Sequence, residues 1–132
     1  MRRAWLFGLM AYSAAAAIAA DKPKSSLPSP ADGRPDADIP FIYTTKIRGW
    51  AYDAAHKAVY FIDSRSQSYY VSFIGGCPEL ANARGFQVDT HGSTRLDHFG
   101  SFTVDDVDDT VCQIDRLVEA DLPVGLKIVG RR

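Results

Sequence analysis

The chain has 132 residues, and 15 Lys and Arg against 16 Asp and Glu give it a formal net charge of −1. This length allows one domain. The near balance of charge excludes a nucleic-acid-binding protein, which needs a basic face to displace counterions from phosphate. It also excludes a polybasic protein that adheres to membrane surfaces.

The first twenty residues have the three parts of a secretory signal peptide. Residues 1–3 include two arginines, residues 4–17 are uncharged and rich in Ala, and residues 17–20 are mostly small. We therefore expect cleavage after Ala19 or Ala20 and a periplasmic or secreted mature protein; the alternative is an uncleaved anchor. Cleavage leaves 13 of the 15 basic residues against 16 acidic ones, a net charge of −3. No cysteine lies at the cleavage point to carry a lipid, so no stable membrane anchor is expected.

Residues 21–40 differ sharply in composition from residues 41–130. They are rich in Pro, Ser and Asp, and Leu27 and Ile39 are their only large aliphatic residues. Such a segment cannot bury enough apolar surface to offset its ordering entropy. We predict a flexible Pro-rich linker over 21–40 and a single β-rich domain over 41–130.

The aromatic residues of this domain fall between Phe41 and Phe102, in short runs with Val, Ile and Thr. Turn-forming residues separate the runs every eight to twelve residues or so, about the spacing of antiparallel β structure. The fold class is therefore mainly β, a small antiparallel sheet or partly open barrel with one or two short helical turns; the alternative is α+β. We predict strands over 46–52, 58–62, 69–74, 86–90, 99–104 and 111–115.

Two segments need separate treatment. Residues 78–85 predict one or two helical turns, because Pro suits the first helical position and Gly the end. The tail 117–132 fits either a short helix beginning near Asp121 or an edge strand over 126–129. Tyr69 and Tyr70 are adjacent strand residues that face opposite sides, so one of them lies outward or on a second packed surface.

Cys77 and Cys112 are the only cysteines. In an exported chain an even pair predicts a disulfide. Alternation places both sulfurs inward, because Cys112 shares a strand face with Ile114 and Cys77 continues the face of Val71 and Phe73. The alternative is a redox or nucleophilic thiol, but the spacing is not C-x-x-C and no protease signature follows either cysteine.

His91, Asp97 and His98 are the candidate functional residues, and all three lie inside the disulfide loop. Their H-x6-H spacing matches no zinc pattern, so polar residues in exposed turns are the simpler interpretation. The aspartate run 105–109 lacks the central Gly and closing Glu of a calcium loop. Nucleophile-elbow, phosphate-loop and H-E-x-x-H motifs are missing from the sequence. We therefore predict no metal site, no cofactor and no assigned catalytic residue.

Several stretches together resemble a known family. They are the tyrosine-rich strand before Cys77, the segment 77–83 beginning Cys-Pro-Glu-Leu, Ser-Thr-Arg-Leu-Asp-His-Phe at 93–99, and Cys-Gln-Ile with a later Leu at 112–117. Over residues 44–126 the chain resembles the family called domain of unknown function 6491. The resemblance implies a small exported domain with a paired cysteine, chiefly from proteobacteria, without an assigned activity or catalytic residues. Members often carry a lipoprotein cysteine, which this chain lacks.

These observations favour a non-catalytic periplasmic or secreted binding module. Its expected partner is an envelope protein or a cell-wall component, and the oligomeric state is left open. The alternative is a small hydrolase or metal-dependent enzyme using His91, Asp97 and His98. A redox-responsive protein is a third hypothesis.

Overall fold

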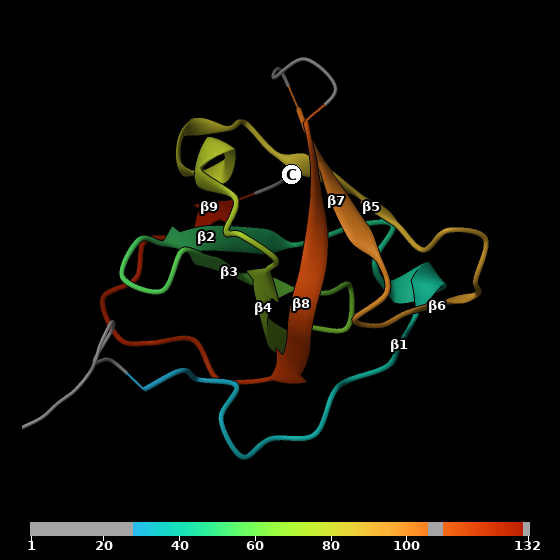
Figure 1. Cartoon of the computed structure of the whole chain (residues 1–132), viewed down its shortest axis with the longest axis horizontal. Helices are drawn as coiled ribbons and strands as arrows, with labels where there is room; N and C mark the ends of the chain where they lie inside the picture. Colours follow the sequence, from blue (N-terminus) through green and yellow to red (C-terminus); the bar gives the residue numbers. More distant parts are fainter. Residues whose placement is uncertain (1–27, 106–109, 131–132) are drawn as a thin grey trace, which may run out of the picture.

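A computed structural model describes residues 28–105 and 110–130 of the chain (Figure 1). The predicted signal peptide, its cleavage site and the first part of the predicted linker lie outside these described residues. So does most of the aspartate run, 106–109. Among the residues described, no helix is long and apolar enough to cross a membrane.

The described chain is mainly β, which confirms the predicted fold class. Short strands follow one another with two 3-10 helices between them. In chain order the elements are β1 (Ile39–Pro40), η1 (Phe41–Tyr43), β2 (Gly49–Asp53), β3 (Ala58–Ile62), β4 (Ser68–Phe73), η2 (Pro78–Asn82), β5 (Phe86–Asp89), β6 (Arg95–Leu96), β7 (Ser101–Val104), β8 (Val111–Glu119) and β9 (Val129–Gly130).

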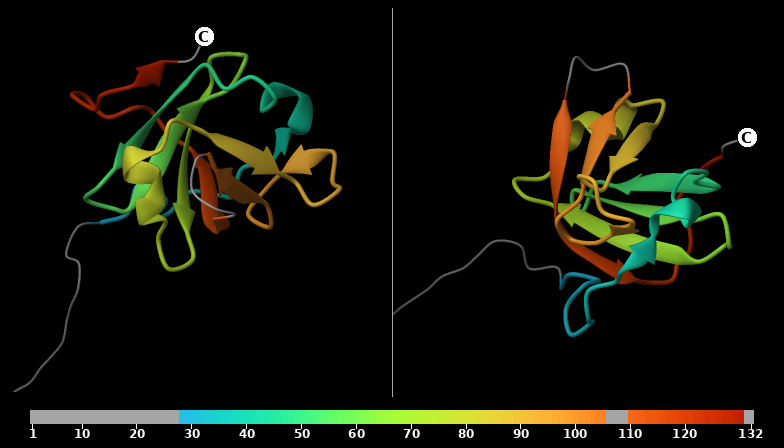
Figure 2. Two further views of the ribbon diagram at one scale, coloured as in Figure 1. Left: turned by 90° about the horizontal axis from the view of Figure 1, so that it is seen from above. Right: turned by 90° about the vertical axis from the view of Figure 1, so that its right-hand side faces the viewer.

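The main sheet has the strand order β5-β7-β8-β4-β3-β2-β9, and every neighbouring pair is antiparallel. β1 and β6 form a separate two-stranded pair. β8 is shared: residues 111–113 pair with β7, and residues 114–119 pair with β4. The sheet curls along β8 into a half-barrel, so that β5 and β7 stand across β2 and β3 (Figure 2).

The concave side of the half-barrel holds the main core. Phe102 lies at its centre, where its ring stacks on Phe86 with 4.2 Å between centroids. The edges of Phe61 and Phe73 contact the same ring at 6.0 and 5.2 Å. Burial of aromatic rings of this size dominates the stability of a small domain. Tyr69, Val71, Cys77, Cys112 and Ile114 are buried on the same side, as the predicted alternation requires.

A second, smaller core lies on the convex side. Tyr70 packs edge-on against Tyr60 with 5.2 Å between centroids, and both are buried. Ala31, which precedes the first strand, and Ala120, which follows β8, belong to the same cluster. Tyr69 and Tyr70 therefore serve opposite cores, which confirms the prediction of a second packed surface.

The prediction of a flexible linker is wrong for residues 28–40, which we call the N-terminal strap. This strap lies against the sheet and passes beneath the end of β8 (Figure 1). Ala31 and Ile39 are only 2% and 1% exposed. The Ala37 amide donates to the Leu117 carbonyl at 2.6 Å. The domain therefore begins before Phe41, because the buried Ala31 and Ile39 and hydrogen bonds to distant strands hold the strap against the sheet.

The helical turn and the tail are also settled. The predicted turn over 78–85 is present but shorter, as the 3-10 helix η2 (Pro78–Asn82). β8 extends to Glu119, and β9 pairs with β2. Of the two alternatives for the tail, strand is therefore correct, although the edge strand lies slightly later than expected.

Cys77 and Cys112 form a disulfide, as predicted. Their Cα atoms are 5.9 Å apart, with a sequence separation of 35. The bond joins the segment after β4 to the first half of β8. It thus crosses the bend of the half-barrel.

Reduction of this disulfide should lower the melting temperature by well over ten degrees. In the chain-entropy model a loop of this length contributes about 4 kcal/mol, and each kcal/mol corresponds to about 4–8 °C in a domain of this size. Calorimetry with and without a reductant measures the shift. The Cys77→Ala/Cys112→Ala variant is the control and should melt at one low temperature in both buffers. A shift of a degree or two in the natural protein would contradict the prediction.

Candidate functional site

His91 lies in the turn between β5 and β6, in the left-handed backbone region with φ 58°. Its Nε2 is 3.2 Å from Ser101 Oγ, and its Nδ1 is 3.7 Å from Asp89 Oδ1. The order of the three groups is that of a Ser-His-Asp triad. Ser101 is only 1% exposed, however, so a substrate has no approach to its hydroxyl. The arrangement fixes a turn against β7 and does not present a nucleophile.

Asp97 and His98 have other partners. Asp97 closes its own turn, because its Oδ1 accepts a hydrogen bond from the Phe99 amide at 3.0 Å. His98 Nδ1 lies 3.6 Å from the Asp36 carboxylate, and its ring contacts Phe99 at 4.1 Å. The structure therefore gives His91, Asp97 and His98 separate neighbours and does not gather them around one pocket. No observation favours a hydrolase built on them.

The described residues include one group of three potential metal ligands, Cys77, Glu79 and Cys112. Both cysteine sulfurs are bonded to each other. A thiolate is the form that binds metal, and neither sulfur is free to become one in the oxidised protein. His91 and His98 belong to no such group among the residues described.

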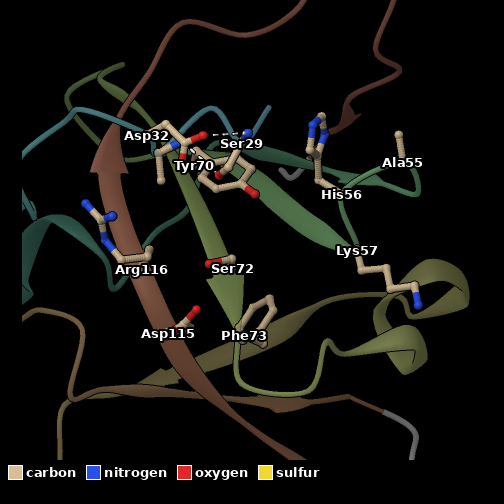
Figure 3. A pocket seen from close by; sticks show the side chains of 11 residues that line it. Ser29, Asp32, Ala55, His56, Lys57, Tyr70, Ser72, Phe73, Asp115 and Arg116 are labelled. Atoms are coloured by element: carbon tan, nitrogen blue, oxygen red, sulfur yellow. Dashed lines mark hydrogen bonds between the residues drawn. The ribbon is translucent and has the colours of Figure 1, made fainter. Parts of the chain in front are cut away.

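A half-open cavity of about 640 Å³ lies on the convex face of the sheet (Figure 3). We call it the Tyr70 cavity. Its lining comes from four segments: the N-terminal strap at 29–32, the β2–β3 turn at 55–57, β4 at 70–73 and β8 at 115–116. These segments converge because the sheet curls along β8 and the strap packs on the second core.

His56 joins two walls of the Tyr70 cavity. Its Nδ1 is 2.7 Å from Asp53 Oδ2, and its Nε2 is 3.0 Å from the Pro28 carbonyl oxygen. Both partners are acceptors, so only the doubly protonated imidazolium donates to both at once. The ring thus attaches the start of the strap to the β2–β3 turn.

Tyr70 forms the floor of the cavity, and its hydroxyl is hydrogen-bonded to Ser29. Burial raises the pKa of Tyr70, and the hydrogen bond to Ser29 partly offsets this rise. The nearby carboxylates of Asp53, Asp32 and Asp115 raise the pKa further. The hydroxyl therefore stays protonated at neutral pH and acts as a polar floor.

Two opposite charges at the rim are available to a ligand. Lys57 and Asp115 are exposed side chains at separate ends of the cavity, with Ser72 between them (Figure 3). Within the described chain, neither charge has a hydrogen-bonded or ion-paired partner. Arg116 differs, because its guanidinium donates to the Asp36 carboxylate at 2.8 Å. Among the described lining residues, Lys57 thus offers an unpaired cation, Asp115 an unpaired anion and Ser72 a hydroxyl.

Sequence reasoning did not single out Lys57 or Asp115. The pairing of β8 explains the second: Ser72 lies opposite Arg116, Phe73 lies opposite Ile114, and Asp115 is the extra residue of a bulge. A bulge lets two successive residues face the same side, so both acid and guanidinium line the cavity. The signal available in the sequence was weaker. It consisted of the adjacent pair Tyr69 and Tyr70, one of which was expected to lie outward or on a second packed surface.

The fold and this cavity define a class of protein: a small disulfide-linked half-barrel with an open cavity on its convex face. The chain belongs to the family of unknown function DUF6491, which matches residues 1–122. This match confirms the resemblance drawn from the sequence and extends it over the N-terminal strap. No curated protein and no solved structure gave a significant match to the chain.

The tyrosines of the convex core should make the fold sensitive to alkali. Burial, aided by Asp53 and Tyr70, raises the pKa of Tyr60 from 10.0 to about 12. The unfolded chain releases this proton near pH 10, so the stabilisation is complete below pH 10 and is lost as the pH rises toward 12. Melting temperatures across this range should therefore fall. The melting temperature of the Tyr60→Phe variant should fall less over the same pH range. An equal fall in both proteins would contradict the raised pKa of Tyr60.

Proposed function

We propose that this protein is an exported, non-catalytic binding module that holds a polar ligand of the cell envelope in the Tyr70 cavity. One observation carries the proposal: Lys57 and Asp115, at two ends of a cavity on a disulfide-linked sheet, have no ion-paired partner among the residues that the structure describes. Binding sites for small ligands have volumes of about 300–1,000 Å³, and this cavity has about 640 Å³.

The charges indicate the chemistry of the ligand. A carboxylate on the ligand would pair with the Lys57 ammonium, and an amino group would pair with the Asp115 carboxylate. Ser72 lies between them and offers a hydroxyl that donates or accepts. Peptides of the cell wall carry both groups. We therefore propose a zwitterionic peptide fragment of the wall as the ligand class.

Export is supported by two independent features. Residues 1–20 have the composition of a cleaved signal peptide. The Cys77–Cys112 bond is of the kind that persists in oxidising compartments such as the periplasm.

Export has a direct test. The protein recovered from the periplasm or medium should begin at Ala20 or Asp21, as measured by N-terminal sequencing. A variant that lacks residues 1–20 is the control, and it should remain in the cytoplasm with reduced cysteines. Recovery of the uncleaved chain in the membrane fraction would contradict cleavage and favour an N-terminal anchor.

Ligand binding has a separate test. Soluble fragments of digested peptidoglycan, titrated into the oxidised full chain, should shift the amide resonances around Lys57, Ser72 and Asp115. Lys57→Gln and Asp115→Asn should each weaken binding about tenfold or more, because each removes a charge-assisted hydrogen bond. Lys127→Gln is the matched control, since Lys127 is exposed and lies outside the cavity lining. Unchanged affinity in both cavity variants would overturn the proposal.

A further inference from the structure

β5 is the last strand at one end of the main sheet. It pairs with β7 on one side, and no described strand pairs with it on the other. Natural proteins usually shield such an edge with proline, with inward charges or with a covering segment. β5, with the sequence Phe-Gln-Val-Asp, contains no proline and one acidic residue at its end.

The hydrogen bonds of the β5–β7 pair show which backbone groups of β5 face this free side. The Gly85 carbonyl accepts a hydrogen bond from the Asp105 amide at 3.0 Å. Bonded and non-bonded positions alternate along an antiparallel pair, and the register is unbroken from Phe86 to Asp89. The amides and carbonyls of Phe86 and Val88 therefore point away from β7.

A cleft of about 540 Å³ runs along this free edge. We call it the β5 cleft. Residues 86–88 form one wall, and Phe41 with residues 44–47 forms the other. The Phe86 side chain turns into the core, where it stacks on Phe102. The backbone of β5, and not its apolar side chains, is thus what the cleft presents.

The chemistry of the cleft selects its occupant. Phe86 and Val88 each present one amide donor and one carbonyl acceptor to the free edge. The backbone of another extended segment can form hydrogen bonds with all four groups. Lys46 is the one charged side chain among the lining residues, so an acidic group on the occupant would be complementary.

We propose that the β5 cleft is a docking site for an extended, acidic segment of a partner polypeptide, which adds as a strand beside β5. This inference goes beyond the proposed function. The β5 cleft and the Tyr70 cavity share no lining residue, so either site can fail its test without affecting the other.

A matched pair of variants isolates the backbone of β5. Val88→Pro removes the outward amide donor and leaves the β5–β7 hydrogen bonds in place, since proline is tolerated in edge strands where its nitrogen faces away from the ladder. Val88→Ala removes the same side chain but keeps the donor. Both variants should melt within a few degrees of each other, and only Val88→Pro should lose the docking site.

The probe is a display library of random eight-residue peptides, selected on the oxidised full chain. An enriched peptide should carry an acidic residue and bind Val88→Pro about tenfold or more weakly than Val88→Ala, as measured by calorimetry. A synthetic copy, N-methylated on alternate residues, should also lose binding to the natural protein. This arm holds even if Val88→Pro fails to fold.

Three results would overturn the proposal. The first is a selection that yields no enriched peptide. The second is a peptide that binds both variants equally and still binds the natural protein when either its odd-numbered or its even-numbered residues are N-methylated. The third is a dimer of the chain, detected by ultracentrifugation, that Val88→Pro abolishes; this would assign the edge to a second copy. Lys46→Glu should weaken the acidic peptide, whereas the matched Lys127→Glu should not.

Discussion

The pairing of β8 with two different strands is the constraint on which the rest of the structure depends. The first part of β8 pairs with β7 and the second with β4, so one strand carries the sheet through its bend. Cys112 lies in the first part and is bonded to Cys77, which comes after β4. The bond therefore holds the two halves at a fixed angle. The two halves enclose the main core on the concave side, and the Tyr70 cavity lies on the convex side.

The irregularity in β8 connects this framework to the site. In a regular strand, successive residues face opposite sides, so either Asp115 or Arg116 would point into the core. Because of the irregularity, both lie on the convex side. Arg116 then binds Asp36 of the strap, and Asp115 lies exposed at the cavity rim, unpaired within the described part of the chain. The same bulge thus anchors the strap that forms one wall and supplies the charge that faces a ligand.

Alternation predicted most of the fold, because it reports which residues share a face. It predicted the inward cysteines and the opposed faces of Tyr69 and Tyr70, whereas the strand over 58–62 was predicted from its run of β-forming residues between two turns. The strap was not, because its contacts join residues such as Asp36 and Arg116, 80 positions apart. Composition carries no information about such distant partners. The Tyr70 cavity was missed for the same reason, since four separate segments form it.

The N-terminal strap has a consequence for the order in which the domain assembles. Its contacts are with the end of β8, as in the hydrogen bond from Arg34 to the Glu119 carbonyl, 85 residues away. Closing so long a loop is entropically costly until its partners exist. The ribosome makes the strap before any strand of the main sheet, yet β8 must be complete before the strap can dock. The first part of the domain to be synthesised is therefore among the last to be placed, and the cavity wall that the strap forms closes only after β8 has been made.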